Sequence, residues 1–570
     1  MTVLTYPVPF RINDGFAGFH GDTTITQWTM WWMKYALTHG INPNYSDHIF
    51  HPAGINLAYS EAGYLYSLVS VPLQLIWDLT TAYNIIWILT FYVSALSMYA
   101  FSYYLTRDRT VSFVIGLAFA FQPFRAHHSL YHLNLLNTQW IPLFVLYLIR
   151  TVRETRMTNP LIAGIILAFT ALSTNQYVMF LFIFSVIWLS AEFLKKPGSI
   201  LDRGLITRFA VLLFTSLIIT VPIRYPTIEA YYQTPLETGM SENMMFSMDL
   251  NHYKRPLKIH PLFGTESQIM PDFFRGTWLM DPIGSGSSRG YLGYALMLAA
   301  ALGVLTRFRD SAIWLALAVI FLVLSLGPVL HVGGETRVFG RDEIILPYAF
   351  LYEHIPLVSA FRTPDRFVLM LFFSLSVAGC YGMAEVRKTF DRGRIWRIRL
   401  GTVAVMILAA IMMLEYTVVP FPMQNRIEHH QIYYQMRDEV GDYAILDIPL
   451  GIGGEYLYHQ PVHEKKLVFG YASHLTPADH NNLMAFLNTR ELATLDGRIP
   501  NTGRPLIVET QSFLRMYGLR YVIIHKRYYQ NITQLQNLRA YSDTVLGQPY
   551  LEDNDLIVYR LENNSISWNT

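Results

Sequence analysis

Residues 82–109 read AYNIIWILTFYVSALSMYAFSYYLTRDR, and this stretch decides the class of the protein. Its apolar part, residues 82–105, is long enough for a helix to cross a bilayer, which takes about 20 residues. Arg107 and Arg109 follow directly. Because basic residues beside a span are retained on the cytoplasmic side, the stretch predicts both a transmembrane helix and its direction.

Further apolar runs follow along the chain, at residues 110–124, 130–149, 160–173, 177–193, 209–223, 291–305, 312–330, 367–383 and 400–419. Together with the first run they predict a transmembrane domain of about 10 helices over residues 82–420. The composition agrees, because 15% of the residues are charged where soluble domains have roughly 25%. The fold class is therefore a polytopic α-helical membrane protein.

Basic residues gather in alternate loops, which predicts the orientation. The loops expected in the cytoplasm carry Arg107 and Arg109; Arg150, Arg153 and Arg156; Lys195, Lys196, Arg203 and Arg208; Arg307 and Arg309; and Arg387, Lys388, Arg392, Arg394, Arg397 and Arg399. The outer set comprises residues 1–81, 127–132, 174–176, the large loops 224–290 and 331–366, and the tail 421–570. We expect a multi-pass protein of the cytoplasmic (inner) membrane with its C-terminal domain on the outer side.

Residues 1–81 are expected to form a first outer loop with helices lying on the membrane. Residues 22–38 combine Trp28, Trp31 and Trp32 with polar residues, and residues 64–77 resemble a second such helix. An outer N-terminal segment of this length is hard to translocate without a preceding span, so we expect a transmembrane helix upstream of Met1. The alternative is that residues 65–77 span the membrane, which would invert the charge rule for every later loop.

The tail, residues 421–570, has apolar runs of strand length at 443–448, 467–470, 519–524 and 556–559. Residues 509–517 fit a helix that Gly518 ends. A soluble α/β domain follows from this pattern, and its length supports a core of its own. Cys380 is the only cysteine, so an intramolecular disulfide is excluded.

Several function classes are disfavoured by the sequence. A formal net charge of +2 without a concentrated basic patch argues against a nucleic-acid partner. The phosphate-binding patterns GxxxxGK[ST] and GxGxxG between a strand and a helix are absent from the sequence. Ionisable residues inside the apolar runs are scarce, Glu415 being one exception, whereas ion-coupled transporters need such residues.

Short polar motifs in the outer loops resemble the GT-C superfamily of polyprenyl-phosphate-dependent glycosyltransferases. They are Asn13-Asp14-Gly15, Gly21-Asp22, Asn42-Pro43, Phe50-His51-Pro52-Ala53-Gly54, Gln122-Pro123-Phe124-Arg125, His132-Leu133-Asn134, Thr138-Gln139-Trp140, Tyr291-Leu292-Gly293-Tyr294 and Arg362-Thr363-Pro364-Asp365-Arg366-Phe367. The resemblance covers most of the membrane region and implies a glycosyltransferase with an essential acid in its first outer loop. Its partners would be membrane lipids, a polyprenyl-phosphate-linked sugar and an unidentified glycan, lipid or protein acceptor.

An acid suits this loop because a carboxylate within hydrogen-bond reach can take the proton of an acceptor hydroxyl, which is otherwise a weak nucleophile. Asp22 is the first candidate and Asp14 the second. The structural alternative for Asp22 is the N-cap of a helix beginning at Thr23. Asp14 sits in an Asn-Asp-Gly sequence, where a turn alone accounts for an aspartate.

The leaving group would be a lipid phosphate, whose growing negative charge calls for cations. Arg125, Arg362 and Arg366 lie at outer ends of predicted spans. The alternative for each is an interfacial arginine that reaches toward water or headgroups. His127, His128 and His132 are candidates to clamp the headgroup or to bind a divalent metal, although isolated interfacial histidines are commoner than metal ligands.

Two rival functions remain open at this point. One is a lipid or polysaccharide transporter or flippase, which would need a polar pathway across the spans. The other is a non-catalytic scaffold for envelope assembly whose tail binds partners, and in which Asp22 would be dispensable.

Overall fold

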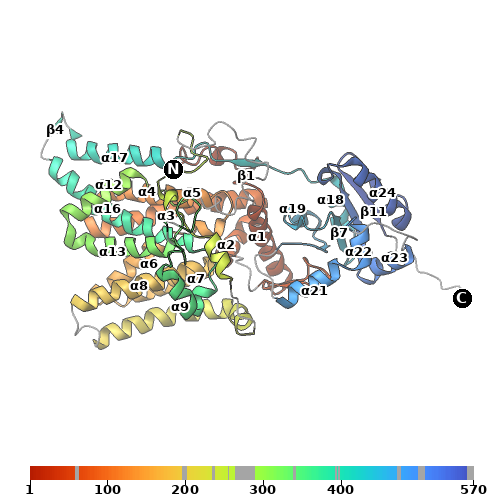
Figure 1. Ribbon diagram of the computed structural model, residues 1–570, viewed down its shortest axis with the longest axis horizontal. Coiled ribbons are helices and arrows are strands. Elements are labelled where there is room, and N and C mark those ends of the chain that lie inside the picture. Colours follow the sequence, from red (N-terminus) through yellow and green to blue (C-terminus); the bar gives the residue numbers. More distant parts are fainter. Residues whose placement is uncertain are drawn as a thin grey trace. The chain divides into compact units, whose positions relative to one another are not determined.

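The computed structural model describes residues 1–57, 63–195, 202–233, 238–254, 256–262, 289–337, 340, 342–391, 394–395, 398–471, 477–498 and 507–561 (Figure 1). The chain forms two compact units. The helical unit comprises residues 1–19, 63–66 and 80–425, and the α/β unit comprises residues 20–62, 67–79 and 426–570.

Every predicted apolar run overlaps a helix of the helical unit, although the helix in the run 130–149 begins only at its middle, at Trp140. The helices are α3 (Leu79–Thr106), α4 (Arg109–Phe121), α6 (Trp140–Arg153), α7 (Thr158–Ser173), α8 (Asn175–Lys195), α9 (Arg203–Gln233), α12 (Tyr294–Thr306), α13 (Phe308–Ser325), α16 (Val368–Phe390) and α17 (Leu400–Tyr416). Among the described residues, 6 helical segments are long and apolar enough to cross a membrane: Leu79–Thr106, Leu133–Arg153, Asn175–Lys195, Arg203–Gln233, Phe308–Ser325 and Pro364–Phe390. The prediction of a multi-pass helical membrane protein is confirmed.

The alternative span at residues 65–77 is not supported by the helix found there. Helix α2 (Tyr64–Gln74) has 11 residues, about half of what a span needs, and it contains Pro72. Its residues are also divided between the two units.

Helices α12 and α16 approach each other unusually closely, and glycines make this possible. A Cβ atom added to Gly303 would lie 2.0 Å from the carbonyl oxygen of Ala378, and one added to Gly382 would lie 2.1 Å from that of Ala299. Small residues at such contacts let helix backbones pack directly in membrane proteins. Glu415 of α17 completes this region, because its carboxylate accepts hydrogen bonds from the backbone N–H groups of Tyr294 and Ala295 at the start of α12.

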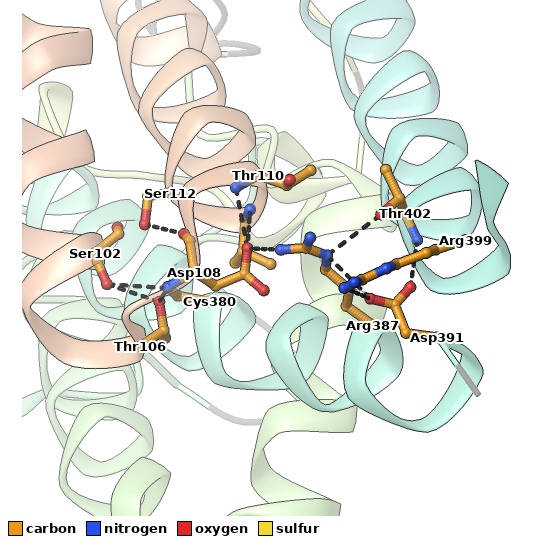
Figure 2. Close-up of polar contacts among 11 residues, drawn as sticks. Ser102, Thr106, Asp108, Thr110, Ser112, Cys380, Arg387, Asp391, Arg399 and Thr402 are labelled. Carbon is orange, nitrogen blue, oxygen red and sulfur yellow. Dashed lines mark hydrogen bonds and ion pairs between the residues drawn. The ribbon is translucent and has the colours of Figure 1, made fainter. Parts of the chain in front are cut away.

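The basic loops predicted to face the cytoplasm are tied to one another by ion pairs. These pairs are Arg387–Asp108, Arg307–Glu385 at 3.7 Å and Arg153–Glu192 at 3.7 Å. Figure 2 shows the network that joins the α3–α4 turn to α16 and α17. In it, Asp391 accepts from the backbone N–H of Thr402 at 3.2 Å, while Arg387 pairs with both Asp108 and Asp391.

Asp108 is the residue of this network with the clearest structural task. Its carboxylate caps α4 by accepting from the N–H groups of Thr110 and Val111, in addition to pairing with Arg387. Asp108→Ala is expected to lower the free energy of unfolding by about 2 kcal/mol, mostly through loss of the cap. Thermal unfolding in detergent measures this. Asp310→Ala, which removes an exposed ion pair with Arg307, is the control and should shift the Tm far less; equal shifts would contradict the prediction.

The α/β unit is built on a five-stranded sheet of order β10-β11-β9-β7-β8. The strands are β7 (Ala444–Ile448), β8 (Lys466–Leu467), β9 (Leu519–His525), β10 (Leu551–Glu552) and β11 (Leu556–Arg560). Strand β7 runs parallel to β8 and β9, whereas β11 is antiparallel to its neighbours. The strands predicted at 443–448, 519–524 and 556–559 are confirmed, whereas the strand expected at 467–470 is the two-residue β8, which shares only Leu467 with the prediction. Helices of this unit include α18 (Gln431–Asp438), α19 (Gly453–Tyr456), α20 (Gln460–His463), α21 (Pro477–Leu487), α22 (Arg490–Leu495), α23 (Ile507–Met516) and α24 (Ile532–Leu546).

Much of the first loop folds into the α/β unit. Helix α1 (Asp22–His39) buries its tryptophans in the same apolar core as strands β7 and β9. Trp28 donates its indole N–H to Gln460 at 2.6 Å, and the amide of Gln460 donates to the carbonyl of His48 at 2.6 Å. Residues 48–51 also pair with Leu467 of β8 through two backbone hydrogen bonds of 2.8 and 3.0 Å. The aromatic residues of α1 therefore pack against protein, where the sequence suggested a membrane interface.

His463, at the end of α20, makes the stability of this unit depend on pH. Burial, with a smaller effect of Lys465, lowers the pKa of His463 to about 3. The unfolded chain takes up the proton near pH 6.5, so the unfolded state holds more protons below that pH. Stability should therefore fall by up to about 1.4 kcal/mol per pH unit as pH drops from 6.5 toward 3.

Thermal unfolding between pH 7.5 and 5 checks this pH dependence. His463→Asn preserves an acceptor for the backbone N–H of Lys465, which His463 Nδ1 accepts at 3.0 Å. This variant should show a shallower decline of Tm with falling pH. A decline as steep as that of the wild type would show that other groups dominate.

Candidate functional site

Three of the predicted site residues lie on one short segment of the helical unit. Helix α5 (Pro123–His128) carries His127 and His128, and His132 follows immediately before the 3-10 helix Leu133–Leu136. Pro123 at the first turn fixes the start of α5, because proline favours that position. The Nδ1 atoms of His128 and His132 are 3.3 Å apart, so this segment presents its imidazoles as one group.

Two arginines and an aspartate from distant parts of the chain join these histidines. Arg289 Nη2 lies 2.6 Å from Asp365 Oδ2, and both side chains are buried. Asp365 belongs to the 3-10 helix Pro364–Phe367, and the next residue, Arg366, donates to Gln176 Oε1 at 2.7 Å. Arg289 and Arg366 both act electrostatically on His127 and His128. We call these six residues the basic cluster: His127, His128, His132, Arg289, Asp365 and Arg366.

The basic cluster is arranged to hold an anion. Burial, together with the charges of Arg289 and Arg366, lowers the pKa of His127 and His128 far below the usual value, so both imidazoles are neutral at pH 7. Two guanidinium groups then face one carboxylate, which leaves an excess of positive charge. Among the described residues, the buried atoms His128 Nε2 and Arg289 Nε have no hydrogen-bond partner, and the Asp365 oxygens, also without a hydrogen-bond partner, are held by the ion pair to Arg289. A buried cationic group with unused hydrogen-bonding atoms suits a phosphate.

Arg125 and Arg362 have other surroundings. Arg125 is entirely buried, and its guanidinium donates to the carbonyl oxygens of Ala120 and Leu136 and to the hydroxyl of Thr138. These bonds occupy its guanidinium inside the protein, and a role of Arg125 in substrate binding stays a prediction. Arg362 is partly exposed and lies 3.4 Å from Glu242 Oε1.

The two candidate acids fall in different units. Asp14 belongs to the helical unit and forms an exposed ion pair with Arg11 at 3.3 Å, as a turn residue would. Asp22 belongs to the α/β unit and is the first residue of α1, with Gly21 in the N-cap position. Gly21 makes no side-chain cap hydrogen bond, so the cap role considered for Asp22 stays a prediction. Convergence of Asp22 with the basic residues stays a prediction.

The histidines of the basic cluster were also candidates for a metal. Within the described part of the chain, no group of three or more His, Cys, Asp or Glu side chains is arranged to hold a metal ion. His128 and His132 contact each other, because their Nδ1 atoms are hydrogen-bonded to one another.

Sequence reasoning did not single out Arg289 and Asp365. Both nevertheless adjoin motifs that it quoted, since Arg289 precedes Tyr291-Leu292-Gly293-Tyr294 and Asp365 lies within Arg362-Thr363-Pro364-Asp365-Arg366-Phe367. An aspartate beside an arginine at the start of a predicted span was the available signal, because a buried carboxylate there needs a cation. Nothing in the sequence paired it with Arg289, which is 76 positions away (365 minus 289).

Solved structures show which fold this is. The arabinofuranosyltransferase AftD from Mycobacteria superposes with a TM-score of 0.50 at 13% identity, over 97% of this chain and 40% of that chain, and a second AftD structure gives 0.51. ArnT from Cupriavidus metallidurans bound to undecaprenyl phosphate gives 0.48 at 10% identity, over 96% of this chain and 94% of that one. AglB from Archaeoglobus fulgidus, in complex with an inhibitory peptide and a dolichol-phosphate, gives 0.43 at 11% identity, over 95% and 68%.

The likeness to AftD confirms the GT-C fold that the sequence motifs predicted. This chain spans less than half of the length of AftD. A comparison with curated protein sequences finds no match. The profile of one family, described as a domain of unknown function (DUF6311), matches residues 14–414. This match covers most of the chain, and the protein therefore belongs to the DUF6311 family.

Proposed function

We propose that this protein is a glycosyltransferase that moves a sugar from a polyprenyl-phosphate-linked donor to an acceptor at the outer face of the inner membrane. The observation that carries the proposal is the basic cluster, a buried excess of positive charge with unused hydrogen-bonding atoms, set in a GT-C fold. The arabinofuranosyltransferase AftD, which shares the fold, supports sugar transfer as the class of reaction.

In the proposed reaction, the acceptor hydroxyl oxygen attacks the anomeric carbon of the donor sugar. The bond from that carbon to the phosphate oxygen breaks, and its electron pair leaves with the lipid phosphate. Arg289 and Arg366 stabilise the negative charge that develops on the phosphate, which is worth most in a buried site. Asp22 takes the proton of the attacking hydroxyl. The products are a glycoside and a polyprenyl phosphate, and no redox step is needed.

The orientation proposed for this reaction rests on the basic loops. Because the loops that contain Arg153, Arg307 and Arg387 are the most basic, we place them in the cytoplasm. His127 lies before α6, whose last residue is Arg153, and Arg366 lies before α16, which contains Arg387 in its last turn. The basic cluster is therefore at the ends of these helices opposite the basic loops, and we assign it to the outer face. The α/β unit follows α17 on that same side.

To test the proposal, the full chain is reconstituted in liposomes of bacterial membrane lipids. A panel of radiolabelled undecaprenyl-phosphate sugars is then added as candidate donors. We expect at least one donor to be consumed, with release of undecaprenyl phosphate and appearance of a labelled glycoside. The rival flippase function predicts that all donors stay intact while a fluorescent undecaprenyl-phosphate lipid crosses the bilayer. That second pattern would refute the proposal.

A further inference from the structure

The carboxyl edge of the sheet in the α/β unit carries polar groups that the basic cluster does not explain. Asp447 lies at the end of β7, and His525 is the last residue of the parallel strand β9. Their side chains are buried, with His525 Nε2 and Asp447 Oδ1 2.7 Å apart. In open sheets with parallel strands, ligands bind just outside such carboxyl ends.

A more accessible group stands in the two segments that follow these strands. Glu455 of α19 lies 2.8 Å from Arg527, and Tyr528 donates its hydroxyl to the same carboxylate. The guanidinium of Arg527 also covers the Tyr528 ring, 4.7 Å from its centroid. Side chains of Glu455 and Arg527 are 42% and 45% exposed, so this group is open to solvent.

The same edge adjoins the segment that carries the candidate base. Helix α1 packs against α19 and α20, and both Glu455 and Arg527 act electrostatically on His20, two residues before Asp22. Sequence separation of more than 400 residues hides this proximity. We call His20, Glu455, Arg527 and Tyr528 the edge cluster.

One buried hydroxyl group near this edge lacks a hydrogen-bond partner within the protein. Tyr433 of α18 is almost fully buried, and its hydroxyl has no hydrogen-bond partner among the described residues. Asp447, Arg527 and Tyr528 all act on that hydroxyl electrostatically. A buried hydroxyl without a partner costs about 1–3 kcal/mol, so this edge of the unit carries an unmet hydrogen-bonding group.

The chemistry of the edge cluster differs from that of the basic cluster. Its one guanidinium is already paired with Glu455, so it has no excess of positive charge to attract a phosphate. It offers instead a carboxylate acceptor, a guanidinium donor and a phenol in mutual contact, with an imidazole on which the carboxylate and the guanidinium act electrostatically. Closely spaced donors and acceptors match the neighbouring hydroxyl groups of a sugar.

We propose that the edge cluster is the acceptor-binding site and that the acceptor it holds is an uncharged carbohydrate, placed with one hydroxyl toward Asp22. This inference rests on the proposed sugar transfer. A lipid or protein acceptor would need a different surface.

Saturation-transfer NMR on the full chain in lipid nanodiscs tests the binding without any donor. The probes are the methyl glycosides of glucose, galactose, mannose, N-acetylglucosamine and arabinofuranose, with a serine-containing tetrapeptide as the rival probe. At least one glycoside should give a signal, and the double variant Glu455→Gln/Arg527→Gln should weaken its affinity by about tenfold or more. The matched control Arg437→Gln/Asp438→Asn removes an ion pair of the same kind from exposed side chains of the same unit and should bind like the wild type.

The outcome separates this inference from the proposed function. If the protein transfers sugar but none of the glycosides binds, or if binding survives in the Glu455→Gln/Arg527→Gln variant, the acceptor site is overturned and the transfer reaction stands. If a glycoside binds at the edge cluster but no donor is consumed, the proposed transfer fails while the carbohydrate site remains. A signal from the tetrapeptide alone would assign the edge to a protein acceptor and contradict the proposal.

Discussion

Asp22→Asn should slow sugar transfer by about 100-fold to 10,000-fold while leaving the protein folded. An amide does not accept the proton of the acceptor hydroxyl, so loss of a general base acts on the chemical step. The change to the fold should be small because asparagine is about as good as aspartate at the start of a helix such as α1. Loss of a negative charge at a helix start costs about 0.3–1 kcal/mol. Product formation at matched protein levels, together with the Tm, measures both effects.

Asp14→Asn is the matched control for this experiment, because it makes the same chemical change in the same predicted loop. Asp14 is exposed and paired with Arg11, so its substitution should leave transfer close to the wild-type rate. If Asp22→Asn is active and Asp14→Asn is not, the role of base passes to Asp14. Near wild-type transfer by both variants would remove the first loop from the chemistry.

Arg289→Gln should have the second largest effect, for two separate reasons. It removes a cation from the leaving phosphate, which is expected to cost about 100-fold to 1,000-fold in transfer rate. It also leaves the buried carboxylate of Asp365 without its 2.6 Å partner, which is expected to destabilise the protein by about 3–5 kcal/mol. The single variant therefore confounds folding with catalysis.

A double variant separates the two effects. Arg289→Gln/Asp365→Asn removes both charges of the buried pair, so the protein should fold nearly as well as the wild type. Transfer should remain low, because the phosphate still lacks Arg289. Asp365→Asn alone keeps the arginine but leaves its buried charge unpaired, so it should destabilise the protein while the folded fraction retains most of the activity. If the double variant transferred sugar at the wild-type rate, the pair would be purely structural and the basic cluster would lose its proposed role.

The membrane-spanning helices could be predicted from sequence because their signal is local. A run such as residues 82–105 is apolar along its whole length, and helix α3 extends it by only a few residues at its N-terminal end. The sequence signal for the tail strands is equally local: β9 is found at Leu519–His525, and the prediction was 519–524. Both signals depend on neighbours in the chain, not on distant contacts.

Features that depend on long-range packing could not be predicted. The tryptophans of α1 have the composition of an interfacial helix, yet Trp28 bonds to Gln460 inside the α/β unit. Only the folded chain shows that Arg289 faces Asp365. For Trp28 and Arg289 the deciding partner lies far away in sequence. Arg125 had the sequence position of a snorkelling arginine, but the nearby carbonyl oxygens of Ala120 and Leu136 accept its hydrogen bonds, which the sequence pattern alone does not indicate.

The most direct test of the account is an experimental structure of the full chain in nanodiscs with undecaprenyl phosphate bound. We predict that the phosphate lies within hydrogen-bond distance, about 3 Å, of Arg289 or Arg366, with His128 beside it. The Asp22 carboxylate should stand within about 15 Å of that phosphate, a gap that a sugar and a modest closure can fill. A phosphate bound away from the basic cluster, or Asp22 on the opposite side of the helical unit, would contradict the account.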